Sequence, residues 1–144
     1  MKIRPLQKKD IPQAAEIVRL NYSKKFVRPV LIELKAAFKN KIYPPKYVIV
    51  EDKGKVIGFA GYMPAWMDYG IYEIFWINIT PKEQGKGIGK KLVKAVLGII
   101  KKKGVNTILL TTRYPKFYSN HFSFKTISRF GRNRNQLMML DAKR

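Results

Sequence analysis

The chain contains no cysteine and a single histidine, His121. Without thiols the protein cannot form a disulfide framework, a thiolate zinc site or an acyl-cysteine intermediate. One imidazole is also too few for a histidine-based metal site. We therefore expect neither a bound metal ion nor covalent catalysis through sulfur.

Long apolar runs are missing as well, because no stretch reaches the ~18 residues that predict a membrane-spanning helix. The N-terminus meets charge at Lys8, Lys9 and Asp10 before the apolar core of a signal peptide has formed. No internal repeat or low-complexity linker divides the chain of 144 residues. The sequence predicts a cytoplasmic protein without a membrane partner and with a single domain over residues 1–144.

Acidic residues are scarce: thirty Lys and Arg outnumber nine Asp and Glu, and the formal net charge is +21. A field of this sign attracts anions and speeds their encounter with the protein, but it carries no information about the fold. Nucleic acids, acidic proteins and phosphorylated small molecules are candidate partners on charge alone. Polyamines and lysine-rich tails should be repelled unless acids gather at a binding cleft.

Hydrophobic periodicity predicts a mixed α/β fold of the α+β type, with flanking helices and the order βααβββαβαββ. The central sheet should be mostly antiparallel, with six to seven strands. Asp10 is a good N-cap residue for the first helix, and Gly104 suits the left-handed end of the helix that finishes in a lysine run. Predicted helices cover residues 11–22, 30–39, 88–101 and 114–120, and predicted strands cover 3–6, 47–51, 56–62, 69–80, 105–111, 122–130 and 136–140. Turns at 52–54 and 131–133 should close hairpins.

A glycine-rich loop lies between a predicted strand and a predicted helix. Its residues are Gln84, Gly85, Lys86, Gly87, Ile88 and Gly89, followed by Lys90. Glycines let several backbone N–H groups converge, and the start of a helix adds unsatisfied donors, so this loop predicts a pyrophosphate cradle. The third glycine comes one residue too soon for a dinucleotide fingerprint, and the spacing also fails that of a P-loop.

With the strand before it, this loop resembles the GNAT superfamily of N-acetyltransferases. The family signature [Q/R]-x-x-G-x-[G/A] matches residues 84–89, and the hydrophobic-x-hydrophobic-x-Pro strand end matches residues 77–81. The segments 3–12 and 54–61 also resemble the family, so the likeness covers about residues 1–125 in the right order.

The resemblance implies acetyl-CoA as cosubstrate and direct acetyl transfer to an amine within a ternary complex. It also implies that backbone N–H groups of residues 84–89 hold the pyrophosphate, with Lys90 beside them. Residues Ile77, Asn78 and Ile79 would hold the acetyl carbonyl and the pantetheine arm, where the strand must splay to free a donor. A preorganised N–H at a developing oxyanion stabilises the transition state by several kcal/mol.

Acetyl transfer also needs an acid for the leaving thiolate and a base for the ammonium. In the family the acid is a tyrosine in a segment resembling F-Y-x-x-x-G-F, which Tyr118 matches best. Here one residue is extra and Ser123 replaces the glycine, so Tyr114 remains an alternative. Glu73 is the candidate base, because it resembles the base glutamate of the histone-acetyltransferase branch. A surface carboxylate, with proton loss to water, is the alternative.

The acceptor is not encoded in a motif: a protein N-terminus, a lysine or a small amino compound all fit. The variable segments 23–29, 63–69 and 130–135 are where the family binds acceptors, and 63–67 is apolar for a loop. Basic and aromatic residues alternate at 114–118 and 129–134, which keeps open an RNA- or ribosome-associated module on the same fold. Weak nonspecific nucleic-acid binding is expected in either case, and both a monomer and a homodimer fit the sequence.

Overall fold

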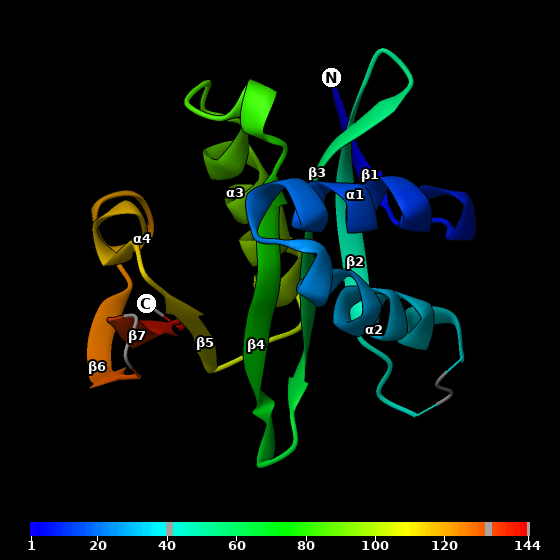
Figure 1. Ribbon diagram of the computed structural model, residues 1–144. Coiled ribbons are helices and arrows are strands. Elements are labelled where there is room, and N and C mark those ends of the chain that lie inside the picture. Colours follow the sequence, from blue (N-terminus) through cyan, green and yellow to red (C-terminus); the bar gives the residue numbers. More distant parts are fainter. Residues whose placement is uncertain (40–41, 132–133, 144) are drawn as a thin grey trace.

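A seven-stranded sheet forms the centre of the protein, and the computed structural model describes residues 1–39, 42–131 and 134–143 (Figure 1). The strands are β1 (Lys2–Pro5), β2 (Lys46–Asp52), β3 (Lys55–Ala65), β4 (Asp68–Ile79), β5 (Thr107–Thr112), β6 (Lys125–Phe130) and β7 (Asn135–Asp141). Their spatial order is β1-β2-β3-β4-β5-β7-β6. Among the described strands, only β4 and β5 pair in parallel. The predicted fold class is confirmed.

Helices cover both faces of this sheet. They are α1 (Ile11–Asn21), α2 (Val27–Lys39), α3 (Ile88–Lys101) and α4 (Pro115–Phe122). One apolar core packs α1 and α2 against β2 and β3, and a second packs α3 and α4 against the opposite face. The two layers are visible in Figure 1, where α1 and α2 lie in front of the sheet and α3 lies behind it. Within the described ranges, no helix is long and apolar enough to cross a membrane.

Helix α3 illustrates how the pattern produces the packing. Its residues Ile88, Leu92, Val96 and Ile100 recur at helical spacing, and all four are buried in the second core. Each such side chain stabilises the fold by roughly 1.5–3 kcal/mol relative to exposure. Gly104 follows with a φ of 71°, the left-handed conformation predicted for it.

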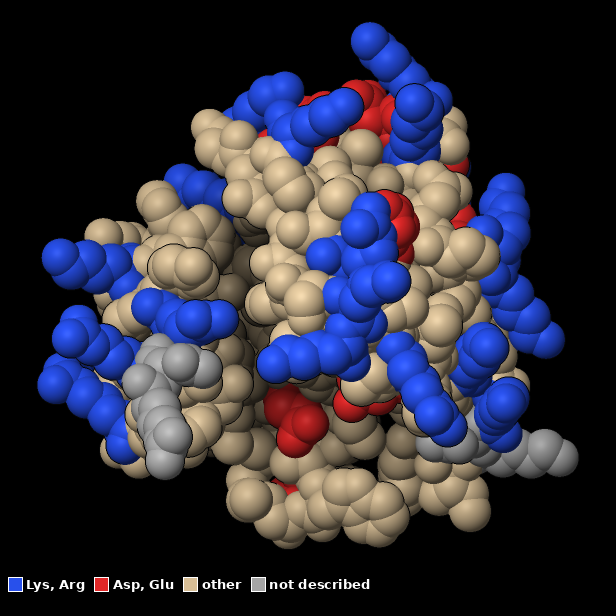
Figure 2. Space-filling model, viewed as in Figure 1, with Lys and Arg blue, Asp and Glu red and all other residues tan. Residues whose placement is uncertain are grey.

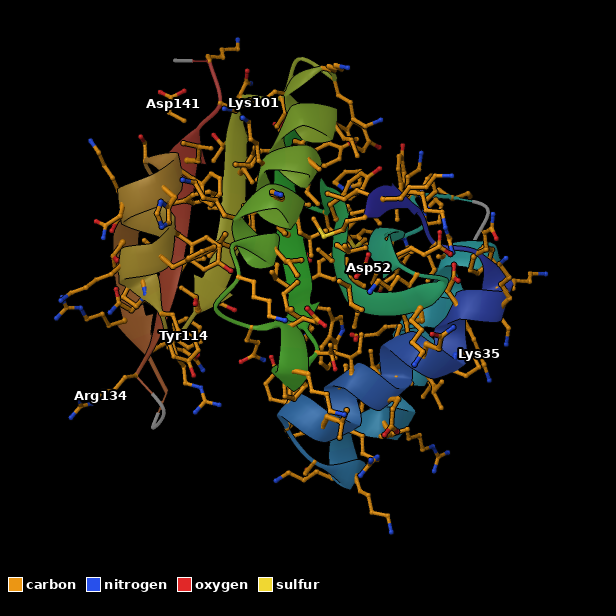
Figure 3. The ribbon with its side chains drawn as sticks, turned by 90° about the horizontal axis from the view of Figure 1, so that it is seen from above. Lys35, Asp52, Lys101, Tyr114, Arg134 and Asp141 are labelled. Carbon is orange, nitrogen blue, oxygen red and sulfur yellow. The ribbon has the colours of Figure 1, made fainter. Side chains whose placement is uncertain are left out.

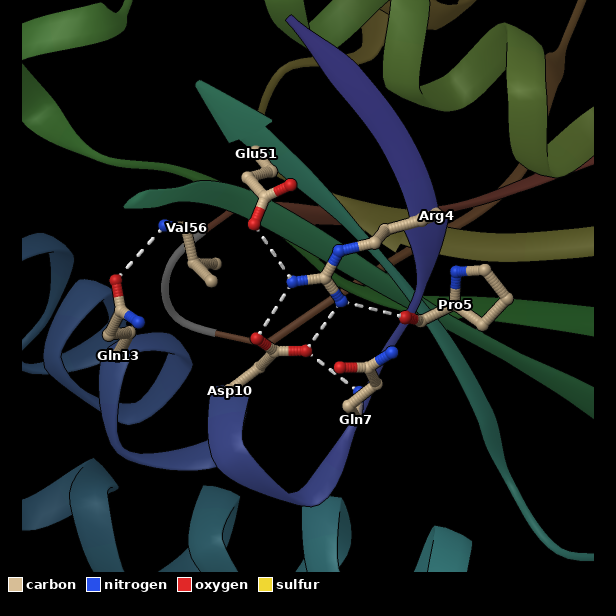
Figure 4. Close-up of polar contacts among 7 residues, drawn as sticks. All are labelled: Arg4, Pro5, Gln7, Asp10, Gln13, Glu51 and Val56. Carbon is tan, nitrogen blue, oxygen red and sulfur yellow. Dashed lines mark hydrogen bonds and ion pairs between the residues drawn. The ribbon is translucent and has the colours of Figure 1, made fainter. Parts of the chain in front are cut away.

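Asp10 precedes α1 as predicted, but its side chain does not cap that helix. Instead it is buried, accepts the Gln7 backbone N–H at 2.8 Å, and forms two hydrogen bonds with the Arg4 guanidinium at 2.7 and 3.0 Å (Figure 4). Arg4 also donates to Glu51 at 3.2 Å. The Arg4 guanidinium beside it holds the pKa of Asp10 below its ordinary value. Asp10 is therefore the N-cap residue as predicted, but its side chain makes no capping hydrogen bond because the ion pair with Arg4 occupies the carboxylate.

The segment 63–67, expected as a loop, is the end of a β-hairpin. Strand β3 continues through Met63 and Pro64 to Ala65, and β4 begins at Asp68. The side chain of Trp66 at the tip is 93% exposed. Of the second predicted hairpin turn, residues 132–133 lie outside the described residues, while the flanking strands β6 and β7 pair as expected.

Candidate active site

Strand β4 contains a β-bulge that opens the sheet. Phe59 opposes Asn78 and Gly61 opposes Phe75, so β4 has one more residue than β3 between these pairs. Trp76 lies in the bulge with a φ of 50°, which is unusual for a bulky side chain. The ladder between β4 and β5 ends at the pair of Glu73 and Leu109. Beyond it the two strands diverge, as Figure 1 shows.

The glycine loop lies at the end of β4 and leads into α3. Gly85 and Gly87 have φ angles of 79° and 81°, and a Cβ at either position would meet no atom within 4 Å. Gly87 is the N-cap of α3, and no side chain caps the helix there. The first N–H groups of this helix therefore have no side-chain cap, and together with the helix dipole they favour an anion. The loop is thus suited to a phosphate group.

Three amides connect this loop to β4 and α1. Gln84 donates from Nε2 to the Asn21 side-chain oxygen at 3.0 Å and to the Ile79 carbonyl at 2.9 Å. Asn21 in turn donates to the same carbonyl at 2.9 Å and to the Asn78 side-chain oxygen at 3.0 Å. The Asn78 Nδ2 group is buried without a hydrogen-bond partner. This network fixes the loop relative to the bulged strand.

A cleft between the diverging strands has two chambers. The donor-side chamber, of about 560 Å³, reaches Asn78, Ile79 and Gln84 near the glycine loop. The other, of about 510 Å³, extends along the bulge to the far end of β5 and is called the outer chamber below. Both are lined by the same five residues at their junction: Asn21, Tyr22, Ile77, Tyr114 and Tyr118. Figure 2 shows the hollow from the side of α1.

Tyr118 and Tyr114 both reach this junction, but their surroundings differ. Tyr118 lies on α4 and is buried, and desolvation, with a smaller contribution from Tyr22, raises the pKa of its hydroxyl. Tyr114 is 74% exposed. It lies at the edge of the lobe formed by β5, α4, β6 and β7, on the side that faces the cleft (Figure 3). Helix α4 ends at Phe122 and is followed by Ser123, whose φ of 62° is in the left-handed region that glycine adopts most easily. A serine therefore adopts a left-handed conformation at the position where the sequence departs from the glycine of the family pattern.

Three other candidates lie away from the junction. Glu73 is exposed, lines neither chamber and has Met63 and Leu109 as cross-strand neighbours. Partial desolvation raises the pKa of its carboxyl. Lys86 forms an ion pair with Glu83 at 3.0 Å. His121 packs against Phe117 with ring centroids 5.3 Å apart and lines neither chamber.

Sequence reasoning missed Asn21, Tyr22 and Arg113. The first two end α1, and Asn21 contacts residues 57 and 58 positions later in the chain. No local pattern reports such a contact, although a polar and an aromatic residue at the end of an apolar helix are a weak signal. Arg113 follows β5 and lines the outer chamber.

Elsewhere, a larger cavity of about 690 Å³ lies between α1 and α2, but it touches neither the bulge nor the glycine loop. It therefore lacks the groups that acyl transfer requires. In the part of the chain that the structure describes, no group of three or more His, Cys, Asp or Glu side chains could hold a metal ion.

The model of the GNAT acetyltransferase family matches residues 12–123, most of the chain. The chain belongs to the GNAT family. GNAT acetyltransferases are acyltransferases that use acetyl-CoA, and the protein is an enzyme of this class. A comparison with curated protein sequences found no match.

Solved GNAT structures have the same fold. A GNAT-family protein from Desulfovibrio desulfuricans superposes with a TM-score of 0.86 at 17% identity, over 98% of both chains. An aminoglycoside 6'-N-acetyltransferase complexed with coenzyme A gives 0.78 at 15% identity, over 99% of this chain and 97% of that one. The PaiA N-acetyltransferase from Thermoplasma acidophilum, also with coenzyme A, gives 0.76 at 20% identity, over 97% and 98%.

Proposed function

We propose that the protein transfers the acetyl group of acetyl-CoA directly to the amine of an acceptor, with both substrates bound in the cleft. One observation carries the proposal. The cleft that begins beside the glycine loop continues past Ile77 and Tyr118 into a second chamber. A donor anchored at the loop and an acceptor in the outer chamber would therefore meet at this junction.

The donor would bind along β4 and the start of α3. Its pyrophosphate would accept hydrogen bonds from the backbone of the glycine loop and the first turn of α3, because these donors are uncapped. Ile77 and Ile79 would face the pantetheine arm, and the unpartnered Nδ2 group of Asn78 is an available hydrogen-bond donor beside them. Lys90, exposed in the first turn of α3, would add positive charge near the phosphates.

In the reaction the amine nitrogen attacks the thioester carbonyl carbon and a tetrahedral oxyanion forms. Ile77 follows the bulge at Trp76 and lines the cleft, so its N–H is the proposed oxyanion donor. The C–S bond then breaks, and Tyr118 donates its proton to the departing thiolate. Burial keeps the Tyr118 hydroxyl protonated at neutral pH, which suits an acid.

Glu73 is the proposed final acceptor of the ammonium proton. It lies four residues before Ile77 on β4, a separation of about 13 Å at the rise of a strand. The proton would therefore reach it through water rather than directly. Its raised pKa makes it a better base than an ordinary surface carboxylate.

Substituting Gly87 by Asp tests the donor site. The new carboxylate would lie where the pyrophosphate is proposed to bind, so acetyl-CoA affinity measured by calorimetry should fall at least tenfold. Gly54→Asp is the matched control, since Gly54 has a φ of 77° and equally open surroundings in a hairpin turn. It carries the same backbone strain and the same charge, and should leave affinity unchanged. A folded Gly87→Asp variant that binds acetyl-CoA normally would exclude the proposed donor site.

A further inference from the structure

The walls of the outer chamber identify the kind of acceptor that fits it, provided that the proposed function holds. Six aromatic side chains line it: the proposed acid Tyr118, and Tyr22, Phe26, Phe75, Trp76 and Tyr114. Those of Tyr22, Phe26 and Tyr114 are 46%, 37% and 74% exposed, so their faces are available to a ligand.

Part of this wall is held in a fixed arrangement. Tyr22 packs on Phe26 with ring centroids 5.6 Å apart and meets Trp76 edge to face at 6.3 Å. The Trp76 indole N–H donates to the carboxylate of Glu33, which restrains the ring. Preorganised aromatic faces bind flat apolar groups at little cost in conformational entropy.

The charge of the chamber has one sign. Arg113 is the charged side chain among its lining residues, and none of the nine acids, all of which lie in the described ranges, lines either chamber. In Figure 2 lysines and arginines flank the hollow, while acidic side chains lie at its lower end. Lys25 lies over the Phe26 ring at 5.4 Å from its centroid. Figure 3 places Arg134 on the same lobe and the same side of the sheet as Tyr114.

We propose that the acceptor is an aliphatic amine that carries both an aromatic ring and an anionic group, of the kind represented by an aromatic α-amino acid. The ring would pack against the wall formed by Tyr22, Phe26 and Trp76. The carboxylate would pair with Arg113, and the amine would lie between them at the junction, facing Tyr118 and Ile77. A polycationic amine would find no carboxylate in the chamber lining to offset the loss of its hydration.

The same charge would assist the chemistry. A nearby cation disfavours an ammonium ion, so Arg113 would favour the neutral, nucleophilic form of the bound amine. The acceptor's own anionic group would offset the repulsion on binding. An acceptor without that group would experience the repulsion alone, which explains why a chamber free of acids selects anionic substrates.

The test compares acceptors that differ in one charge. Release of the coenzyme A thiol is followed with L-phenylalanine, L-phenylalaninamide, L-alanine and spermidine. The amine of the amide is the less basic, so an unassisted reaction would favour the amide. We expect kcat/KM for L-phenylalanine to exceed that for the amide at least tenfold, and L-alanine and spermidine to be poorer still.

Arg113→Gln should remove the preference for L-phenylalanine over its amide, or invert it, with acetyl-CoA affinity unchanged by calorimetry. Arg129→Gln, an exposed arginine on β6 that does not line the cleft, is the matched control and should leave the preference intact.

The failure of this inference and the failure of the proposed function are distinguishable. The proposed acceptor class is wrong if acetyl-CoA binds but spermidine or L-phenylalaninamide is the better acceptor. It is also wrong if acetyl-CoA binds but L-phenylalanine is not acetylated. If the protein does not bind acetyl-CoA, the proposed function itself is wrong. An unchanged preference in Arg113→Gln would exclude the role of this residue.

Discussion

Tyr118 is buried at the point where the two chambers of the cleft meet, and this position leads to a specific expectation. Tyr118→Phe removes one hydroxyl and retains the ring that packs against Phe117 and Phe124. Acetyl-CoA affinity should therefore persist, while kcat falls roughly 10²–10⁴-fold because the thiolate leaves unprotonated. Calorimetry and steady-state kinetics on the same preparation separate the two effects.

Tyr114→Phe is the natural comparison, since this tyrosine lines the same junction but is mostly exposed. Its kcat should change by less than about tenfold, because an exposed phenol can be replaced by water as a proton donor. If Tyr114→Phe loses activity and Tyr118→Phe does not, the acid is Tyr114.

If Glu73 is the base, the activity of the enzyme should depend on pH. A base acts when ionised, and desolvation raises the pKa of this carboxyl above its ordinary value of 4.5. Activity should therefore decline as the pH falls through that raised pKa, and Glu73→Gln should be about 10²-fold less active at neutral pH and lack this acidic limb.

The stability of Glu73→Gln provides the control. A carboxyl whose pKa is higher in the folded than in the unfolded chain opposes folding when it is ionised. The substitution should therefore not lower the Tm at neutral pH. A variant that loses stability but retains its pH profile would show that Glu73 is structural rather than a base.

At the scale of the elements, the contact between β3 and β4 depends on Gly61. A Cβ at this position would clash with the Phe75 ring and would lie 2.6 Å from the ring of Tyr47. Gly61→Ala should lower the free energy of unfolding by about 1–3 kcal/mol, since a Cβ this close forces the rings or the strands to shift. Gly98→Ala in α3 meets nothing within 4 Å and should raise it by about 0.5–1 kcal/mol. Urea denaturation measures both, and equal effects of the same sign would contradict this packing.

Element boundaries followed from the sequence where one periodic pattern dominated. In α3 the apolar spacing, the lysine run and Gly104 all indicate the same helix, and the structure agrees. Asp10 illustrates the limit: its type predicts a capping side chain, but its carboxylate instead accepts hydrogen bonds from Arg4 on β1 and from the Gln7 backbone. Local propensity cannot report competition from a residue on a neighbouring strand.

The candidate site shows the same division. The glycine loop could be predicted from the sequence because its backbone conformation requires glycine, and Gly85 and Gly87 do adopt positive φ. The aromatic wall of Tyr22, Phe26 and Trp76 could not be predicted, since α1 and β4 come together only in the folded chain. The bulge at Trp76 has no local signal either, because tryptophan is not a residue expected in the left-handed region.

At the scale of the whole molecule, the net charge of +21 predicts nonspecific binding to nucleic acids. Lysines and arginines are distributed over the visible surface (Figure 2), so RNA should bind nonspecifically at low salt. If 6–10 phosphates are neutralised, affinity should fall about 10³–10⁵-fold between 50 and 200 mM salt. Fluorescence anisotropy with a labelled single-stranded RNA, with and without acetyl-CoA, measures this.

Acetyl-CoA should displace part of the bound RNA, because the phosphates of both ligands are drawn to the same basic surface around α3. Tight, salt-resistant binding to one RNA, without competition from acetyl-CoA, would instead favour the alternative of an RNA- or ribosome-associated module.

The splay between β4 and β5 has a consequence for self-association. A sheet normally has two free edges, but this one has an additional edge inside the molecule, where β4 runs from Ile74 to Ile79 without a strand partner on that side. Free edges are templates on which other chains can add as strands. Tyr22 and Tyr114 line both chambers beside this edge, and a ligand bound in the cleft would lie along it. Because a bound ligand would cover this edge, the unliganded protein should aggregate more readily than the protein with acetyl-CoA bound.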